Sequence, residues 1–228
     1  MKDPYKSLDA GRMDSIRAAM SAIRRTNTVS DALAVGYYLL ANEFILQKDV
    51  YSSDTCLEQG IKAAIEPGVK GALYQMDEIF ASSILYDAAR SRYSGEQAIR
   101  FYSMAGEWAQ VLTSYSNLVF ASLQYNMCSR GIQQLNHALS YYESIKEKLS
   151  QLEADYYKNE IAPHHTFLKA RCKVCLADSL RIWGNEKQAK NNYKDAKMVL
   201  DAMKKSGLRS WSRGTVYLNL AAAKHRTE

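Results

Sequence analysis

The sequence predicts an all-α protein, and three observations support that prediction. Apolar residues recur at steps of three and four over nearly all of the 228 residues, which is the spacing of one face of a helix. The chain holds only 3 prolines and 11 glycines, too few for a turn-dense β-sandwich. No segment alternates strictly between apolar and polar residues, as a half-buried strand does. Because no linker-like stretch divides the chain, we expect a single domain over residues 1–228.

The individual helices follow from apolar faces and from capping residues. A first helix is predicted over residues 10–25, because Met13, Ile16 and Met20 fall on one face. Ser30 or Asp31 is a suitable N-cap for a second helix that ends near Lys48. By the same criteria, further helices are predicted over residues 52–66, 69–91, 95–105, 107–127, 129–160, 163–183, 186–205 and 210–225. The helix over 129–160 is expected to end before Pro163, since proline disfavours a helix interior.

Small and aromatic residues recur at fixed spacing in the C-terminal half. The pattern consists of Ala177, Leu180 three residues later, Gly184 near a turn, and then Ala189, Tyr193 and Ala196. We expect all of these except Leu180 at the buried contact of one helix pair. This segment resembles the tetratricopeptide repeat (TPR), in which two antiparallel helices pack closely at small residues and an aromatic fills the groove to the next repeat. Weaker copies contain Ala98, Tyr102 and Ala105, and then Gly131, Leu135 and Ala138.

The resemblance implies an irregular, right-handed TPR-like solenoid of antiparallel helix pairs. Its best-matched repeats cover residues 79–140 and 167–205, and residues 210–228 would form a cap or a truncated repeat. In this family the first helix of each pair lines a concave groove that binds partner segments. Carried onto this sequence, the resemblance gives these partner-binding groove residues: Asn42, Arg90, Asn117, Phe120, Arg171, Asp178, Arg181 and Asn219. Asparagine at three of these positions could pair with the backbone of a bound peptide, or could bond a neighbouring helix.

The positive charge of the chain is concentrated at its C-terminal end. Residues 161–228 carry 14 Lys and Arg against 5 Asp and Glu, whereas the whole chain has a net charge of +6. On the predicted helix 186–205, a line of lysines lies beside the apolar face: Lys187, Lys190, Lys194 and Lys197. We expect this basic stripe to receive an acidic segment of a protein partner; the alternative is a solvated helix face.

Cysteine and histidine offer the only hint of site chemistry. Cys172 and Cys175 follow His164 and His165, but this spacing is not one of the usual structural zinc patterns. We therefore favour core cysteines over a metal or redox site, and we expect the four cysteines of the chain to be free thiols. No nucleotide-binding, hydrolase or metalloprotease motif occurs. We expect no catalytic residue, no metal and no cofactor, and hence no enzyme.

These observations lead to two functional hypotheses. The first is a non-enzymatic scaffold or adaptor that binds a protein partner through the groove and the basic stripe. The alternative is a ligand- or peptide-responsive sensor domain of a signalling or transcription regulator. We do not expect nucleic-acid binding, because aromatics are not interleaved with the lysines. A cytoplasmic location is expected, because no apolar leader and no membrane-spanning stretch is found.

Overall fold

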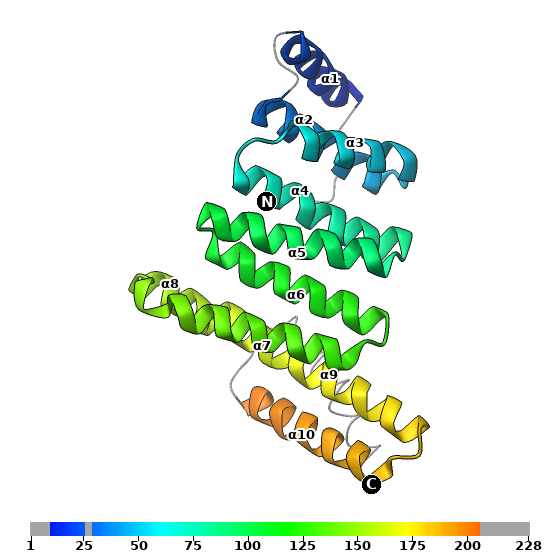
Figure 1. The fold of residues 1–228 in the computed structure, drawn as a ribbon, viewed down its shortest axis with the longest axis vertical. Coiled ribbons are helices and arrows are strands. Elements are labelled where there is room, and N and C mark those ends of the chain that lie inside the picture. Colours follow the sequence, from blue (N-terminus) through cyan, green and yellow to red (C-terminus); the bar gives the residue numbers. More distant parts are fainter. Residues whose placement is uncertain (1–9, 26–28, 206–228) are drawn as a thin grey trace. The chain divides into compact units, whose positions relative to one another are not determined.

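The chain is helical along nearly its whole described length in this computed structural model, which describes residues 10–25 and 29–205 (Figure 1). No β-strand occurs among those residues, so the all-α prediction is confirmed. The contacts between residues group the chain into two units, residues 1–114 and 115–228. The prediction of a single domain stays a prediction.

Unit 1 contains helices α1 (Ala10–Arg24), α2 (Asp31–Leu46), α3 (Val50–Ala63), α4 (Pro67–Phe80) and α5 (Ala88–Ala105), and the first residues of α6 (Trp108–Gln124). Helix α2 pairs with α3, α4 pairs with α5, and α1 packs on α2. The core between α1 and α4 is built from leucine, alanine and aromatic side chains, among them the fully buried Leu57, Leu73 and Phe80. Burial of this apolar surface is the main force that holds the hairpins together.

The chain turns between α4 and α5 at a residue that the sequence does not mark as a turn. A short π-helical segment, Ala81–Leu85, ends at Tyr86, which has a left-handed backbone with φ of 54°. Asp87 then caps α5 by accepting hydrogen bonds from the backbone N–H groups of Ala89 and Arg90. The predicted helices over 69–91 and 95–105 are therefore wrong in their boundary, because residues 88–105 form one helix.

Unit 2 contains the rest of α6, then α7 (Cys128–Ile145), α8 (Gln151–Tyr156), α9 (Ala162–Ile182) and α10 (Glu186–Lys205). Helix α7 packs on α9, and α9 packs on α10. The prediction of a helix over 186–205 is confirmed by the bounds of α10. The predicted helix over 210–225 and the predicted cap or truncated repeat over 210–228 lie outside the described residues.

Pro163 lies inside a continuous run of helical backbone rather than at its end. A π-helical segment, Tyr157–Ile161, joins α8 to α9, and Pro163 follows it in the first turn of α9. A π-turn shifts the hydrogen-bond register, which accommodates a residue without an N–H group. The predicted helix 129–160 is wrong for a second reason, because α7 ends at Ile145 and Ser150 starts a new helix with a capping box to Glu153.

The spacing of small and aromatic residues has a consistent packing role in both units. Tyr102 of α5 lies against Gly71 of α4, where an added β-carbon would come within 2.8 Å of the ring. Tyr193 of α10 is likewise fully buried, between Ala189 and Ala196 of its own helix. Ala98 and Ala138 are also fully buried. A close helix pair with a buried tyrosine is thus found at the two places where the sequence pattern is clearest.

Candidate interaction surfaces

The α9–α10 hairpin is held together by a stripe of alanines. Ala177 of α9 and Ala189 and Ala196 of α10 have no exposed surface, which lets the two helices approach closely. The hydroxyl of Tyr193 donates a hydrogen bond to Asp178, so this predicted groove residue already has a partner within the hairpin. Gly184 was expected at the buried contact as well. It is exposed instead, and its φ of 77° shows that it serves the turn.

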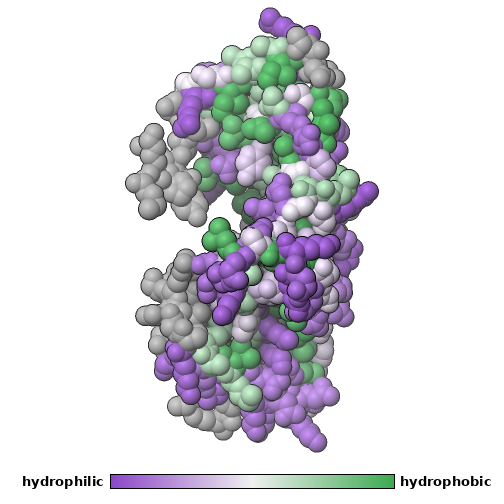
Figure 2. Space-filling model, turned by 90° about the vertical axis from the view of Figure 1, so that its left-hand side faces the viewer, coloured by the Kyte–Doolittle hydropathy of each residue, from purple (hydrophilic) through white to green (hydrophobic). Residues whose placement is uncertain are grey.

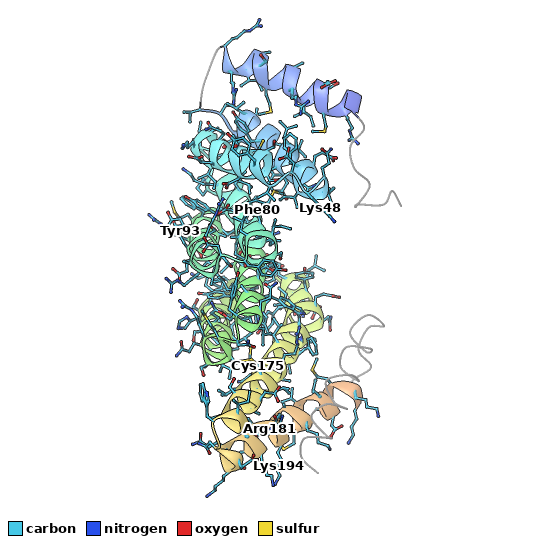
Figure 3. The ribbon with its side chains drawn as sticks, turned by 90° about the vertical axis from the view of Figure 1, so that its right-hand side faces the viewer. Lys48, Phe80, Tyr93, Cys175, Arg181 and Lys194 are labelled. Atoms are coloured by element: carbon cyan, nitrogen blue, oxygen red, sulfur yellow. A yellow bond between two sulfur atoms is a disulfide. The ribbon has the colours of Figure 1, made fainter. Side chains whose placement is uncertain are left out.

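The basic stripe lies on the outer face of α10, as its spacing predicts. Lys187, Lys190 and Lys194 are exposed, and no described carboxylate lies within 4.0 Å of their ammonium groups. Lys197 differs, because it is half-buried and bonds Asp201 at 3.0 Å. Asp195 does not neutralise the stripe, since its carboxylate pairs with Lys173 of α9. Three of the four lysines therefore carry a positive charge that no described carboxylate pairs with. Lys194 is labelled in Figure 3.

Two large apolar side chains are exposed at the turn of the same hairpin. The side chains of Ile182 and Trp183 are 79% and 76% exposed, although residues of these types are usually buried. Arg181, a predicted groove residue, is exposed beside them. The sequence analysis missed this pair. The signal that could have found it is the position of a tryptophan directly before Gly184, beyond the last inward-facing position of α9.

Two predicted groove residues of unit 2 meet where α6 lies against α9. The guanidinium of Arg171 lies 5.9 Å from the centre of the Phe120 ring, within the range of a cation–π contact. The ring of His164 lies 5.7 Å from Phe120, and burial lowers the pKa of this histidine. His165 is held by Ser116 at 2.9 Å. Asn117 is half-buried on the same helix as Phe120.

The remaining predicted groove residues belong to unit 1 or lie outside the described residues. Asn42 is exposed on α2, in unit 1, and Asn219 lies outside the described residues. Arg90 lies in the first turn of α5 and not on the helix that carries Phe80, which corrects the helix assignment behind its selection. Its guanidinium bonds both Asp54 of α3 and Asp77 of α4. Arg90 thus links three helices of unit 1.

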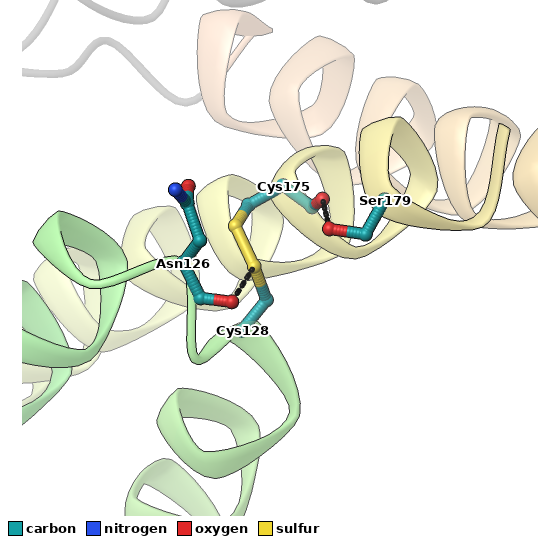
Figure 4. Close-up of a disulfide and its surroundings, with 4 residues drawn as sticks. All are labelled: Asn126, Cys128, Cys175 and Ser179. Atoms are coloured by element: carbon teal, nitrogen blue, oxygen red, sulfur yellow. Dashed lines mark hydrogen bonds between the residues drawn. A yellow bond between two sulfur atoms is a disulfide. The ribbon is translucent and has the colours of Figure 1, made fainter. Parts of the chain in front are cut away.

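The cysteines correct the expectation of four free thiols. Cys128, at the start of α7, and Cys175 of α9 form a disulfide with a Cα–Cα distance of 5.9 Å, which lies in the usual range (Figure 4). Around it, the Ser179 hydroxyl bonds the Cys175 carbonyl, and the Cys128 sulfur lies 3.5 Å from the Asn126 carbonyl oxygen. Cys56 and Cys172 are free and buried. Burial raises the pKa of the Cys172 thiol to about 12, so it is protonated at neutral pH.

No described group of three or more His, Cys, Asp or Glu side chains is arranged to hold a metal ion. No helix within the described ranges is long and apolar enough to cross a membrane. Comparison of the chain with protein-family models, curated proteins and solved structures finds no match.

Proposed function

We propose that this chain is a non-enzymatic interaction module that binds a protein partner, and that the α9–α10 hairpin is its main contact surface. The observation that supports the proposal most is the combination on one hairpin of Trp183 and Ile182, both exposed, with Lys187, Lys190 and Lys194. Tryptophan and arginine are enriched among the residues that dominate the binding energy of an interface, and Arg181 is exposed beside Trp183. The partner segment would carry acidic residues around one or two apolar side chains.

The cluster of Phe120, His164 and Arg171 gives the partner a second place to bind within unit 2. Phe120 is 39% exposed, so a partner side chain can still reach its ring. We propose the TPR-like arrangement, a right-handed solenoid with a concave groove, as the scaffold of this surface. It is supported by the equivalent tyrosine packing of α4–α5 and α9–α10. A groove role for Asn42 and Asn219 remains part of this proposal.

The test is direct binding of two matched synthetic peptides, measured by fluorescence anisotropy. One peptide carries Asp and Glu around a central Leu and Phe, and the other replaces each acid by its amide. We expect only the acidic peptide to bind. Removing Ile182 and Trp183 together (I182A, W183A) should weaken binding at least about tenfold, because such anchors contribute 2 kcal/mol or more.

A matched control removes two exposed apolar side chains elsewhere in unit 2. Leu152 and Tyr156 of α8 are 81% and 50% exposed, and the variant L152A, Y156A should bind the acidic peptide as the wild type does. If both double variants lose the same affinity, or if the amide peptide binds equally well, the hairpin is not the contact surface. The cytoplasmic location stays a prediction, and the Cys128–Cys175 bond counts against it, because disulfides are rare in cytosolic proteins.

A second candidate function, a ligand-responsive sensor, is favoured by one feature of unit 1. A pocket of about 850 Å³ lies between α2, the start of α4 and the end of α5. This volume is typical of sites for small molecules. The test is whether a ligand of this pocket changes the affinity of the acidic peptide for unit 2; a sensor requires such coupling, and a plain scaffold does not.

A further inference from the structure

The pocket of unit 1 has an apolar wall that is open to solvent. Leu73 of α4 is fully buried at its base, whereas Val35 and Leu39 of α2 and Met104 of α5 are between 41% and 61% exposed. These side chains line one concave site rather than being scattered over the surface. Figure 2 shows hydrophobic residues gathered in the upper part of one face, over unit 1. An apolar group that fills the pocket would remove this surface from water.

The charged residues of the pocket lining are all acidic. Glu66, at the N-cap of α4, and Glu107, just after α5, both line it, and no Lys, Arg or His does. No described cation lies within 4.0 Å of either carboxylate. A ligand with a positive charge would therefore be favoured over one with a negative charge.

The Glu107 carboxylate lies against the start of α4. It lies so close to Gly68 that a β-carbon at this position would collide with Oε1, so the glycine makes room for the carboxylate. The first turn of a helix carries a partial positive charge from its free N–H groups, which stabilises an anion there. The Glu107 carboxylate therefore lies at the rim of the pocket, beside the first turn of α4.

We propose that this pocket binds a small molecule with an apolar body and a protonated amine. The apolar body contacts Val35, Leu39 and Met104, and the ammonium group faces Glu66 and Glu107. This inference rests on the second candidate function, for which it names the class of ligand. It does not depend on the α9–α10 hairpin, because every residue that it uses lies in unit 1.

The experiment compares three probes that share one eight-carbon chain: octylammonium, octan-1-ol and octanoate. Binding is measured by ligand-observed NMR titration at neutral pH. We expect octylammonium to bind at least about tenfold more tightly than octanoate, with octanol between them, because the two carboxylates attract an ammonium group and repel a carboxylate. The double variant E66Q, E107Q should bring the three affinities together. The control E58Q, E143Q removes two exposed acids outside the pocket and should leave the order unchanged.

A further variant keeps the proposal testable if the double variant folds poorly. Leu39 is 41% exposed, so L39K places a cation in the lining at little cost to the fold. It should reduce the preference for octylammonium over octanoate without reversing it, because the two glutamates still outnumber the added lysine. Equal affinities of the wild type for the three probes, or a preference that L39K leaves at its full size, would overturn the proposal. Tighter binding of octanol or octanoate to the wild type would leave the pocket as a ligand site and refute only the amine.

Discussion

Gly131 of α7 and Cys172 of α9 face each other so closely that a β-carbon on Gly131 would lie 2.7 Å from the Cys172 sulfur. One turn away on each helix, Cys128 and Cys175 form the disulfide. The two pairs fix α7 and α9 in an antiparallel register, with Leu135 and Leu168 in the same core cluster. The absence of a side chain at position 131 is therefore what sets the distance between these helices.

Substitution of Gly131 by alanine tests this contact. We expect G131A to lower the free energy of unfolding by about 1–3 kcal/mol, since an extra methyl group must displace a buried sulfur. Removing that sulfur in the double variant G131A, C172A should restore part of the loss. The measurement is urea unfolding of both variants and of C172A alone. Simple additivity of the two single substitutions would mean that these residues do not meet.

The disulfide predicts a specific count of reactive thiols. In denaturant, two thiols per chain should react before reduction, from Cys56 and Cys172, and four afterwards. Because the bond joins residues 47 apart in the sequence, its reduction should lower the free energy of unfolding by about 4 kcal/mol. The variant C175S should unfold at the same urea concentration with and without reductant. Four reactive thiols in the chain as purified would refute the pairing.

Close packing of α9 on α10 makes Ala189 intolerant of a larger side chain. It is fully buried at this contact, so A189L should cost about 1–3 kcal/mol through overpacking. Its neighbour Gln188 is exposed, and Q188L should change the free energy of unfolding by less than about 0.5 kcal/mol. Thermal unfolding by circular dichroism distinguishes the two. Equal stability of the two variants would place Ala189 outside the contact.

His164 should make the stability of the protein depend on pH. Burial lowers its pKa in the folded state, so at acidic pH the unfolded chain binds a proton that the folded chain does not. This histidine therefore destabilises the fold progressively as the pH falls below its unfolded pKa of about 6.5. Urea unfolding between about pH 5 and 8 should show a smaller decrease for H164Q than for the wild type. An identical pH profile for both would show that His164 does not contribute.

The sequence and the structure agree best where local spacing decides the outcome. Ala189, Tyr193 and Ala196 predict both the bounds and the buried face of α10, because their spacing is local and all three pack against the neighbouring helix α9. Features that depend on distant residues could not be predicted in this way. The Cys128–Cys175 bond requires the register of α7 on α9, and the pocket of unit 1 requires three helices to converge.

Two other errors have local physical causes. Tyr86 takes a left-handed backbone conformation, which is usually found at glycine. Because a tyrosine at helical spacing does not indicate a turn, the sequence did not predict that a helix ends here. Pro163 usually indicates a helix boundary, but a π-helical segment before it lets the helix continue. Trp183 was overlooked because large apolar residues are expected inside, although its place directly before Gly184 puts it beyond the inward-facing positions of α9.

The salt dependence of peptide binding is the most direct test of the proposal that the α9–α10 hairpin receives an acidic segment. The affinity of the acidic peptide is measured between about 50 and 300 mM salt for three proteins. They are the wild type, the double variant with K190E and K194E, and a control double variant with K148E and K169E. The control reverses the charge of two exposed lysines of unit 2 outside α10, so it has the same net charge as the K190E, K194E variant. We predict that wild type and control lose affinity steeply as salt rises, whereas K190E, K194E binds weakly with a shallow slope. Equal slopes and affinities for all three proteins would contradict the proposal.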